Sequence, residues 1–574
     1  MLNLDNPNFE KPSAILRENS RFLVEQNRFT GPKSYDGFVG GPPLAYDREH
    51  GAVAVDSSDN HTLVYGATGS KKTRCIVMPT IRMLGFAGES MIINDPKGEL
   101  YRTMARFLED QDYNIITLNF RDASVGDCWN FLEIPYRFYK EGNLDKAGEF
   151  IEDVARTITA NTGTDDPFWS SSAASCLYGL ILCLFRYCKE YDKPDEAVNI
   201  GNLLTLRREM FAQKARFSSA HNPIWEWAKK DELIAASMTG TVETASDTQK
   251  GILSVLDLGL KMFIISPSLV DMLSHTTFSF DRIAQEKTAV FLLTPDEKTT
   301  YHRLVSLYIS QSYQQLVQFA DRSGGKLPGR VNYVLDEFSS LPSIGGCDFV
   351  QYLAAGRSRN LRFILCLQSK NQLVHTYKEN AQTITANCTN WIYLFSRELE
   401  LLKDISALCG ERKDHTPNLS VYDLQQLDKE KNQVLLLSAR CKPAIVNLLD
   451  ISGYAPAYPV LPIKTPTRGV RVSLDFNEIQ KEERQSDRFS GSNNPLFNPF
   501  SLNSDTPEPD TKSASSDKLD LGAMLADIDR KIAEIDAQEK AKKPIHLTTK
   551  ARYKPWHTRQ NTPTLILRRI LRPV

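Results

Sequence analysis

A Gly-rich turn between an apolar strand and a helix is the part of the chain with the clearest chemistry. Residues 62–73 read TLVYGATGSKKT, which fits the phosphate-binding pattern G-x-x-x-x-G-K-[ST] at every fixed position but one. Such a loop aims successive backbone N–H groups at phosphate oxygens. The residues expected to bind a phosphorylated ligand are therefore Gly66, Ala67, Thr68, Gly69, Ser70, Lys71, Lys72 and Thr73.

Four of these positions differ in what they can contribute. Gly66 opens the turn, Lys72 can reach the β- and γ-phosphates, and the Thr73 hydroxyl can bind Mg²⁺. Lys71 stands where the pattern has its second glycine. A side chain there requires backbone dihedrals that an L-residue accepts, or a strain of about 1–3 kcal/mol.

An acidic pair far downstream supplies the second part of such a site. The apolar residues Tyr333–Leu335 predict a strand that delivers Asp336 and Glu337 at its C-terminal end, the edge where α/β sheets bind ligands. Asp336 can hold Mg²⁺, and Glu337 can polarise the water that attacks a γ-phosphate. The alternative is a helix cap followed by a first-turn acid. The upstream loop favours the catalytic interpretation, so we expect ATP and Mg²⁺ to bind despite Lys71, without a fast ATPase being implied.

Composition places the chain among ordinary globular proteins. Its 574 residues can form two or more domains, with 41% hydrophobic and 24% charged residues. The formal net charge is −1, so any nucleic-acid surface has to be local. The ten cysteines lack zinc-type spacing and predict reduced, mostly buried thiols. The first thirty or so residues do not form a signal peptide, and the longest apolar stretch, Cys176–Phe185, is about half of a membrane span.

The alternation of strand and helix patterns predicts an α/β domain with an all-helical insertion. Residues 138–262 carry a helical period, seen in Phe150, Val154 and Ile158. The nucleotide-binding domain is expected over residues 38–137 and 263–462, after a polar, partly helical lead-in over residues 1–37. The expected strands are 52–55, 62–65, 90–94, 114–119, 289–293, 333–335, 362–367 and 391–395, closed by a meander of 434–437 and 444–447.

Three further segments follow. Residues 463–518 are rich in Ser, Asn, Pro and charge, which is typical of a disordered linker. Residues 519–543 predict an amphipathic helix too short to be stable alone, so it needs a partner helix, a groove or its own domain. Residues 544–574 form a basic tail that suits nucleic acid or an anionic membrane, or has no specific partner. The apolar seam of the helix consists of Leu521, Leu525, Ile528, Ile532 and Ile535.

Taken together, the motifs resemble the TraG-type coupling proteins of conjugative type IV secretion systems over about residues 38–455. So many motifs in this order are highly specific. Besides the loop at 66–73, they are DPKGE at 95–99, LNFRD with WNFL within 118–132, DPFW at 166–169, LDEF at 335–338, AAGRSR at 354–359 and CLQS at 366–369.

The resemblance implies a fold and further site residues. TraG-type proteins have a RecA-like P-loop domain that carries an all-helical domain, and they form hexamers with ATP between subunits. Arg357 looks like their arginine finger, which would reach the γ-phosphate of a neighbour. Arg359 is the alternate candidate, and a surface salt bridge is the plain alternative for either residue. Gln368 matches their polar sensor of the attacking water or γ-phosphate, where a merely structural hydrogen bond is the competing interpretation.

The resemblance also implies a function. The chain would be a coupling ATPase that recruits a relaxase with single-stranded DNA and drives both through a conjugation channel. TraG-type proteins usually begin with transmembrane helices, and none is expected here. We therefore expect a cytoplasmic protein, peripheral at the inner face of the cell membrane, recruited to the channel components by a separate membrane-anchor protein or by its basic tail.

Two other functions compete with this interpretation. The first is a nucleotide-gated or inactive adaptor that presents protein cargo to a secretion channel, which Lys71 and the long C-terminal region suit. The second is a pump of the FtsK/HerA type acting on duplex DNA. DPKGE, DPFW and the large helical insertion argue against this second alternative.

Overall fold

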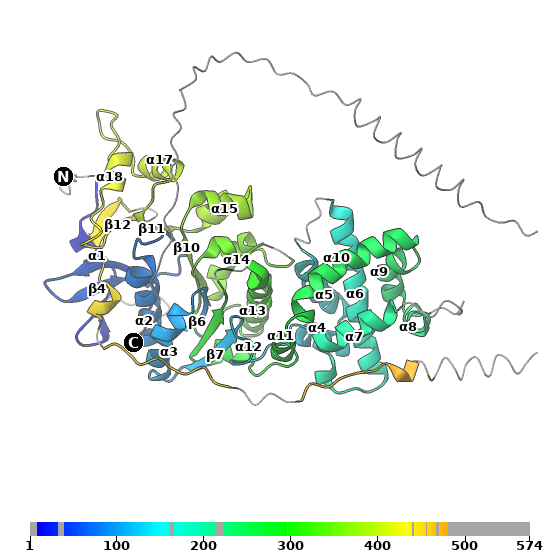
Figure 1. Ribbon diagram of the computed structural model, residues 1–574. Coiled ribbons are helices and arrows are strands. Elements are labelled where there is room, and N and C mark those ends of the chain that lie inside the picture. Colours follow the sequence, from blue (N-terminus) through cyan, green and yellow to red (C-terminus); the bar gives the residue numbers. More distant parts are fainter. Residues whose placement is uncertain are drawn as a thin grey trace, which may run out of the picture. The chain divides into compact units, whose positions relative to one another are not determined.

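The computed structural model describes most of the chain up to residue 481 (Figure 1). The amphipathic helix expected at 519–543 and the basic tail expected at 544–574 lie outside the described residues. The described residues are 8–31, 39–160, 166–212, 222–295, 297, 299–343, 345–438, 441–454, 456–465, 470–479 and 481.

A nine-stranded sheet forms the centre of the α/β part, in the order β13-β12-β11-β5-β10-β9-β6-β8-β7. Neighbours from β11 to β7 are parallel, whereas β12 and β13 add an antiparallel pair at one edge. The expected strands and the closing meander are thereby confirmed, except that the strand expected at 52–55 belongs to a second sheet. The strands are β5 (Thr62–Gly66), β6 (Ser90–Asp95), β7 (Asn114–Asn119), β8 (Thr288–Leu293), β9 (Val331–Leu335), β10 (Leu361–Leu367), β11 (Asn390–Phe395), β12 (Gln433–Ser438) and β13 (Ala444–Asn447).

Both faces of this sheet are buried, as the apolar runs of parallel strands require. Along β10, Phe363 and Leu365 enter one core cluster, whereas Ile364 between them enters another. The second cluster includes residues of α2 (Met78–Ala87) and α3 (Glu99–Glu109); the first includes residues of α13 (His302–Arg322), α14 (Phe349–Gly356) and α16 (Asn380–Asn387). This part of the chain is therefore a three-layer α/β structure.

The N-terminal residues form a second, smaller sheet, which differs from the expected lead-in. After α1 (Pro12–Glu18), β1 (Ser20–Leu23) and β2 (Arg28–Thr30) pair with β3 (Pro43–Asp47) and β4 (Ala52–Val55) in the order β2-β1-β4-β3. Phe22 is fully buried in a cluster with Val53, Val55 and Met83. A single buried aromatic in a polar stretch is a weak sequence signal, so the pairing was not predicted.

Helices fill the stretch between β7 and β8, where the described residues contain no strand. This stretch extends beyond the expected 138–262 at both ends. Asp166 caps α6 by accepting a hydrogen bond from the Phe168 N–H at 2.9 Å, and Pro167 occupies the first turn, which accounts for the start of DPFW. The helices are α4 (Glu133–Lys140), α5 (Leu144–Thr159), α6 (Pro167–Glu190), α7 (Ile200–Met210), α8 (Pro223–Ala228), α9 (Glu232–Val242), α10 (Ser246–Ile264), α11 (Pro267–Met272) and α12 (Phe280–Gln285).

Helix α6 is apolar enough to be compared with a membrane span. Its mean hydropathy over the best window is 1.6, and it is the one helix among the described residues that passes by length and composition. However, 61% of that window is buried, and α6 packs against α5, α9 and α10. The core helix of a soluble protein passes the same test.

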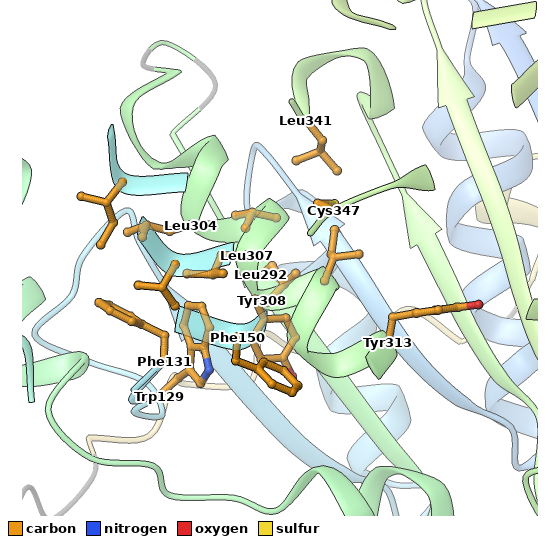
Figure 2. Packing of buried hydrophobic residues seen from close by; sticks show 14 of the residues in the cluster. Trp129, Phe131, Phe150, Leu292, Leu304, Leu307, Tyr308, Tyr313, Leu341 and Cys347 are labelled. Atoms are coloured by element: carbon orange, nitrogen blue, oxygen red, sulfur yellow. The ribbon is translucent and has the colours of Figure 1, made fainter. Parts of the chain in front are cut away.

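Aromatic side chains join the helical insertion to the sheet. Trp129 and Tyr308 meet edge to face at 5.3 Å between ring centroids, and Phe131 and Phe150 lie in the same cluster (Figure 2). Leu292 of β8 also belongs to this cluster, so the insertion and the sheet share one core (Figure 2). The WNFL motif is thus part of the junction.

All ten cysteines are free and nine are buried, as expected; Cys441 is exposed.

We call residues 456–465 and 470–479 the C-terminal strap. The second part of the strap, residues 470–479, packs on the helical insertion, although a linker was expected there. Phe476 is fully buried against Tyr187, with ring centroids 4.7 Å apart. Asn202 forms two hydrogen bonds with the backbone of the strap. Its amide donates to the Val472 carbonyl at 2.9 Å, and its Oδ1 accepts from the Leu474 N–H at 2.9 Å. The expectation of disorder from 463 is wrong here, since a few well-placed apolar residues outweigh a polar average.

Candidate active site

The expected site residues meet at one edge of the sheet. β5, β10 and β9 are parallel neighbours, with Leu367 opposite Tyr65 and Leu365 opposite Leu335. Their C-terminal ends therefore deliver the loop Gly66–Thr73, then Gln368, and then Asp336 and Glu337 to the same edge. The structure brings these residues together, although Thr68 and Gln368 are 300 positions apart.

The loop after β5 is a tight turn held from two sides. A Cβ on Gly66 would lie 2.5 Å from the Ser70 Oγ, so a larger residue there would force the Ser70 side chain to move. The Ser70 N–H donates to the Ala67 carbonyl at 3.0 Å, and the Ala67 N–H donates to the Phe395 carbonyl of β11 at 2.9 Å. The loop then enters a single π-helical turn, Thr73–Val77, which continues as α2.

Lys71 adopts the backbone conformation that its position demands. Its φ is +67°, in the left-handed region that glycine would enter without strain. The Lys71 ammonium donates hydrogen bonds to the Asn432 Oδ1 at 2.8 Å and to the Lys429 carbonyl at 3.1 Å. Lys71 thus keeps the glycine-like turn, and its charge is directed to the turn before β12.

Lys72 and Asp336 form a buried ion pair. The Lys72 Nζ lies 3.3 Å from the Asp336 Oδ1, and the Lys72 side chain is 7% exposed. Burial lowers the pKa of Lys72, but the Asp336 carboxylate opposes this and the pKa ends above its ordinary value. Among the described residues, the buried Ser70 Oγ has no hydrogen-bond partner, and the Asp336 carboxylate is the one ion-pair partner of the Lys72 Nζ. Phosphate oxygens would satisfy both groups, so the loop fits a polyphosphate.

Gln368 connects the loop to the second acid. The Thr68 Oγ1 donates to the Gln368 Oε1 at 2.8 Å, and the Gln368 Nε2 donates to the Glu337 Oε1. Glu337 has a φ of +56°, an uncommon conformation for a non-glycine residue. The chain Thr68–Gln368–Glu337 therefore orients the Glu337 carboxylate toward the loop.

The DPKGE motif supports this edge from β6. The Asp95 Oδ2 accepts a hydrogen bond from the Tyr101 N–H at 2.8 Å, and burial raises the pKa of Asp95 to about 6. The Asn94 amide donates to the Asp336 carbonyl at 2.6 Å, a contact that sequence reasoning missed. Lys97 is exposed, and Glu99 begins α3. Asn94, the residue before the motif, thus fixes the backbone at Asp336, and Asp95 fixes the start of α3.

Arg357 lies at the opposite edge of the sheet. It begins the turn Arg357–Arg359 before β10, whereas Gln368 follows β10, so about 23 Å of strand separates it from the loop Gly66–Thr73. Its side chain is 47% exposed and forms an ion pair with Asp59 at 3.3 Å. Arg359, the alternate candidate, lies 3.7 Å from Asp321. Arg357 cannot reach the loop of its own chain.

An ion pair between Arg74 and Asp450, just after the loop Gly66–Thr73, was not predicted from the sequence. The Arg74 guanidinium forms two hydrogen bonds with the Asp450 carboxylate, at 2.9 and 2.5 Å. Burial raises the pKa of Asp450, but the hydrogen bonds from Arg74 outweigh this effect and lower the pKa to about 2. These residues are 376 positions apart, so nothing in the local sequence links them.

Comparison with known proteins agrees with this architecture. The sequence model of the family described as type IV secretory system conjugative DNA transfer matches residues 17–433. No curated protein sequence matches the chain. The structure resembles the unbound bacterial conjugative coupling protein TrwBdeltaN70, with a TM-score of 0.51 and 16% identity over 77% of this chain and 93% of that chain.

Two nucleotide complexes of TrwB are similar to the same degree. The complex with the ATP analogue ADPNP has a TM-score of 0.52 and 16% identity over 78% of this chain and 95% of that chain. The complex with ADP and Mg²⁺ has a TM-score of 0.52 and 16% identity over 77% and 93%. At such identities the likeness shows the fold alone, and it confirms the RecA-like α/β domain with its helical insertion. Because the family model spans most of the chain, the protein belongs to the type IV secretory system conjugative DNA transfer family, the TraG-type coupling proteins.

Proposed function

We propose that this coupling protein is an ATPase that recruits a relaxase with single-stranded DNA and drives their transfer through a conjugation channel. The observation that carries the proposal is the edge where Lys72 pairs with Asp336 at 3.3 Å while Gln368 ties Glu337 to the phosphate-binding loop. A lysine, a metal-binding acid and an oriented carboxylate are the minimum that phosphoryl transfer needs.

Each residue has a separate task in this scheme. The loop Gly66–Thr73 binds the β- and γ-phosphates, and Lys72 neutralises their charge. Glu337 orients the attacking water and accepts its proton, held in place by Gln368. Magnesium, bound between Thr73 and Asp336, would supply the positive charge that polarises the γ-phosphate. The complexes of TrwB with ADPNP and with ADP and Mg²⁺ support this choice of ligand.

Arg357 acts on a neighbouring subunit in this proposal. Its exposure and its place at the far edge of the sheet suit a guanidinium that completes the site of the next protein in a ring, such as a homo-hexamer. Hydrolysis would then depend on assembly. The DNA and channel partners follow from the family, whose members act in conjugative DNA transfer.

The proposal is tested by ATP turnover over a series of protein concentrations, with and without single-stranded DNA. Hydrolysis that rises steeply with concentration, is stimulated by DNA and is lost in Lys72→Ala and Glu337→Gln supports the motor. Absence of hydrolysis at every concentration supports a second candidate, a nucleotide-gated adaptor. The tie from Lys71 to Asn432 favours that candidate, because it restrains the phosphate-binding loop.

A further inference from the structure

A pocket with a volume of 340 Å³ lies beside the phosphate-binding loop. One wall is the loop itself, residues 68–71; the other walls are the end of β11 and the turn 425–434 that leads into β12. β11 is parallel to β5 and β12 is antiparallel to β11, so the end of β11 and the start of β12 lie at the same edge as the loop. The pocket and the loop therefore form one continuous surface.

The position of the pocket indicates which part of a nucleotide it would take. Glu337 and Gln368 lie on the side of the loop toward β10 and β9, where the reacting phosphate must sit. The rest of the ligand has to leave the loop on the other side, toward β11 and β12. That side is the pocket.

The pocket walls suit a planar, partly polar group. Leu394, Phe395 and Leu427 supply apolar surface, and the amides of Gln425 and Gln433 supply hydrogen-bonding groups. Apolar walls with a few amides are typical of sites that bind flat heterocycles.

The turn over this pocket is shaped before Lys71 contacts it. The Asp428 Oδ1 accepts hydrogen bonds from the Glu430 N–H at 2.9 Å and the Lys431 N–H at 3.2 Å. Asn432 has a φ of +50°, which asparagine tolerates better than most residues. Lys71 then joins the Asn432 side chain and the Lys429 carbonyl to the phosphate-binding loop. Lys71, Lys429 and Asn432 all line the pocket, so this contact is a direct polar link between two of its walls.

We infer that Lys71 is a specificity-determining residue, whose ammonium holds the turn 428–433 against the phosphate-binding loop so that the pocket binds the nucleoside part of the nucleotide. The inference rests on the proposed nucleotide-binding function and deepens it. It assigns a purpose to the residue that replaces glycine: selectivity for a nucleoside triphosphate over a bare polyphosphate.

The test is calorimetry on the full chain with two probes, magnesium ATP and magnesium tripolyphosphate. Lys71→Met removes the ammonium and keeps a side chain at the same φ; Lys71→Gly removes it and suits that φ. We expect both variants to weaken ATP binding by about tenfold, which corresponds to the loss of hydrogen bonds from a charged group. Both variants should weaken tripolyphosphate binding by less than about twofold. Lys413→Met, at an exposed lysine outside both the turn and the pocket, is the matched control and leaves both affinities unchanged.

Asn432 provides an independent arm. Asn432→Ala removes the acceptor of the Lys71 ammonium and also the hydrogen bond from the Asn432 Nδ2 to the Leu448 carbonyl at 3.3 Å. It should weaken ATP binding selectively, and in combination with Lys71→Met the loss should be smaller than the sum of the two single losses, because both variants remove the link between Lys71 and Asn432. Asn432→Asp keeps an acceptor for the ammonium and should retain ATP affinity, which also shows that altered turns fold. Equal affinity of the wild type for both probes, equal losses for both probes, or no loss in any variant would overturn the inference alone. A wild type that binds neither probe overturns the proposed function and the inference with it.

Discussion

The Lys72 ammonium lies 3.3 Å from the Asp336 carboxylate, with both side chains almost fully withdrawn from water. Two opposite charges in such a place stabilise each other only as a pair, since either one alone remains buried without compensation. A triphosphate and its metal would have to take over this contact when they bind. The stability of the nucleotide-free protein and the affinity for nucleotide are therefore linked through the same two residues.

Lys72→Ala should lower the free energy of unfolding by about 3–5 kcal/mol, because it leaves the Asp336 carboxylate buried and unpaired. Adding Asp336→Asn should restore much of this loss, since the remaining group is neutral. Urea unfolding of the wild type, the two single variants and the double variant measures the coupling. Strictly additive effects would show that the pair is not coupled in solution.

Glu337→Gln should reduce ATP turnover by a factor of about 10²–10⁴ and leave ATP binding within about threefold of wild type. The amide cannot accept a proton from water, but it can still take part in a hydrogen bond with Gln368. Turnover and calorimetric affinity, measured on the same preparation, separate the two effects. Wild-type turnover in this variant would rule out Glu337 as the base.

Arg357→Ala should bind ATP normally and lose turnover by a factor of about 10³ or more, because in the proposed scheme the guanidinium completes the site of a neighbouring subunit. Arg359→Ala is the matched control and should retain activity. Mixing inactive Arg357→Ala with inactive Glu337→Gln should restore measurable hydrolysis, because some interfaces then combine an intact Arg357 with an intact Glu337. A mixture that stays inactive at all ratios would count against a shared site.

His61 should make the protein less stable as the pH falls. Burial lowers the pKa of His61 to about 4, and the ring is held neutral because one nitrogen accepts from the Phe363 N–H at 3.1 Å while the other donates to the Leu353 carbonyl at 2.9 Å. Its contribution is fully present above about pH 6.5, the pKa of an unfolded histidine, and is lost toward pH 4, by about 3 kcal/mol.

The measurement for His61 is the difference in unfolding free energy between the wild type and His61→Gln at several pH values. The difference isolates this residue from Asp95, whose raised pKa makes its own contribution fall with rising pH between about 4 and about 6. A difference that is constant from pH 4 to pH 7 would contradict a neutral buried imidazole.

Local patterns in the sequence predicted the parts of this site that strand ends deliver. Asp336 and the Gly66–Thr73 loop each follow a buried apolar strand, and parallel strands must end at one edge. Gln368 also follows such a strand, but it was expected from the family resemblance. The contact from Lys71 to Asn432 joins residues 361 positions apart and depends on the path of a turn, for which no local pattern exists. The packing of Phe476 against Tyr187 escaped prediction for another reason, because average composition conceals a few apolar residues in a polar stretch.

The C-terminal strap connects two distant contacts, the hydrogen bond between Asn202 and Val472 and the ion pair between Arg74 and Asp450. One end is gripped by the helical insertion through Asn202, and its middle is held where the Gly126 N–H donates to the Lys464 carbonyl at 2.9 Å. Toward the N-terminus, the strap follows Asp450, which accepts hydrogen bonds from Arg74 just after the loop Gly66–Thr73. A displacement of the helical insertion relative to the sheet would therefore have to carry the strap with it or break its bonds to Asn202 or Gly126, so this one segment limits how far the two can separate.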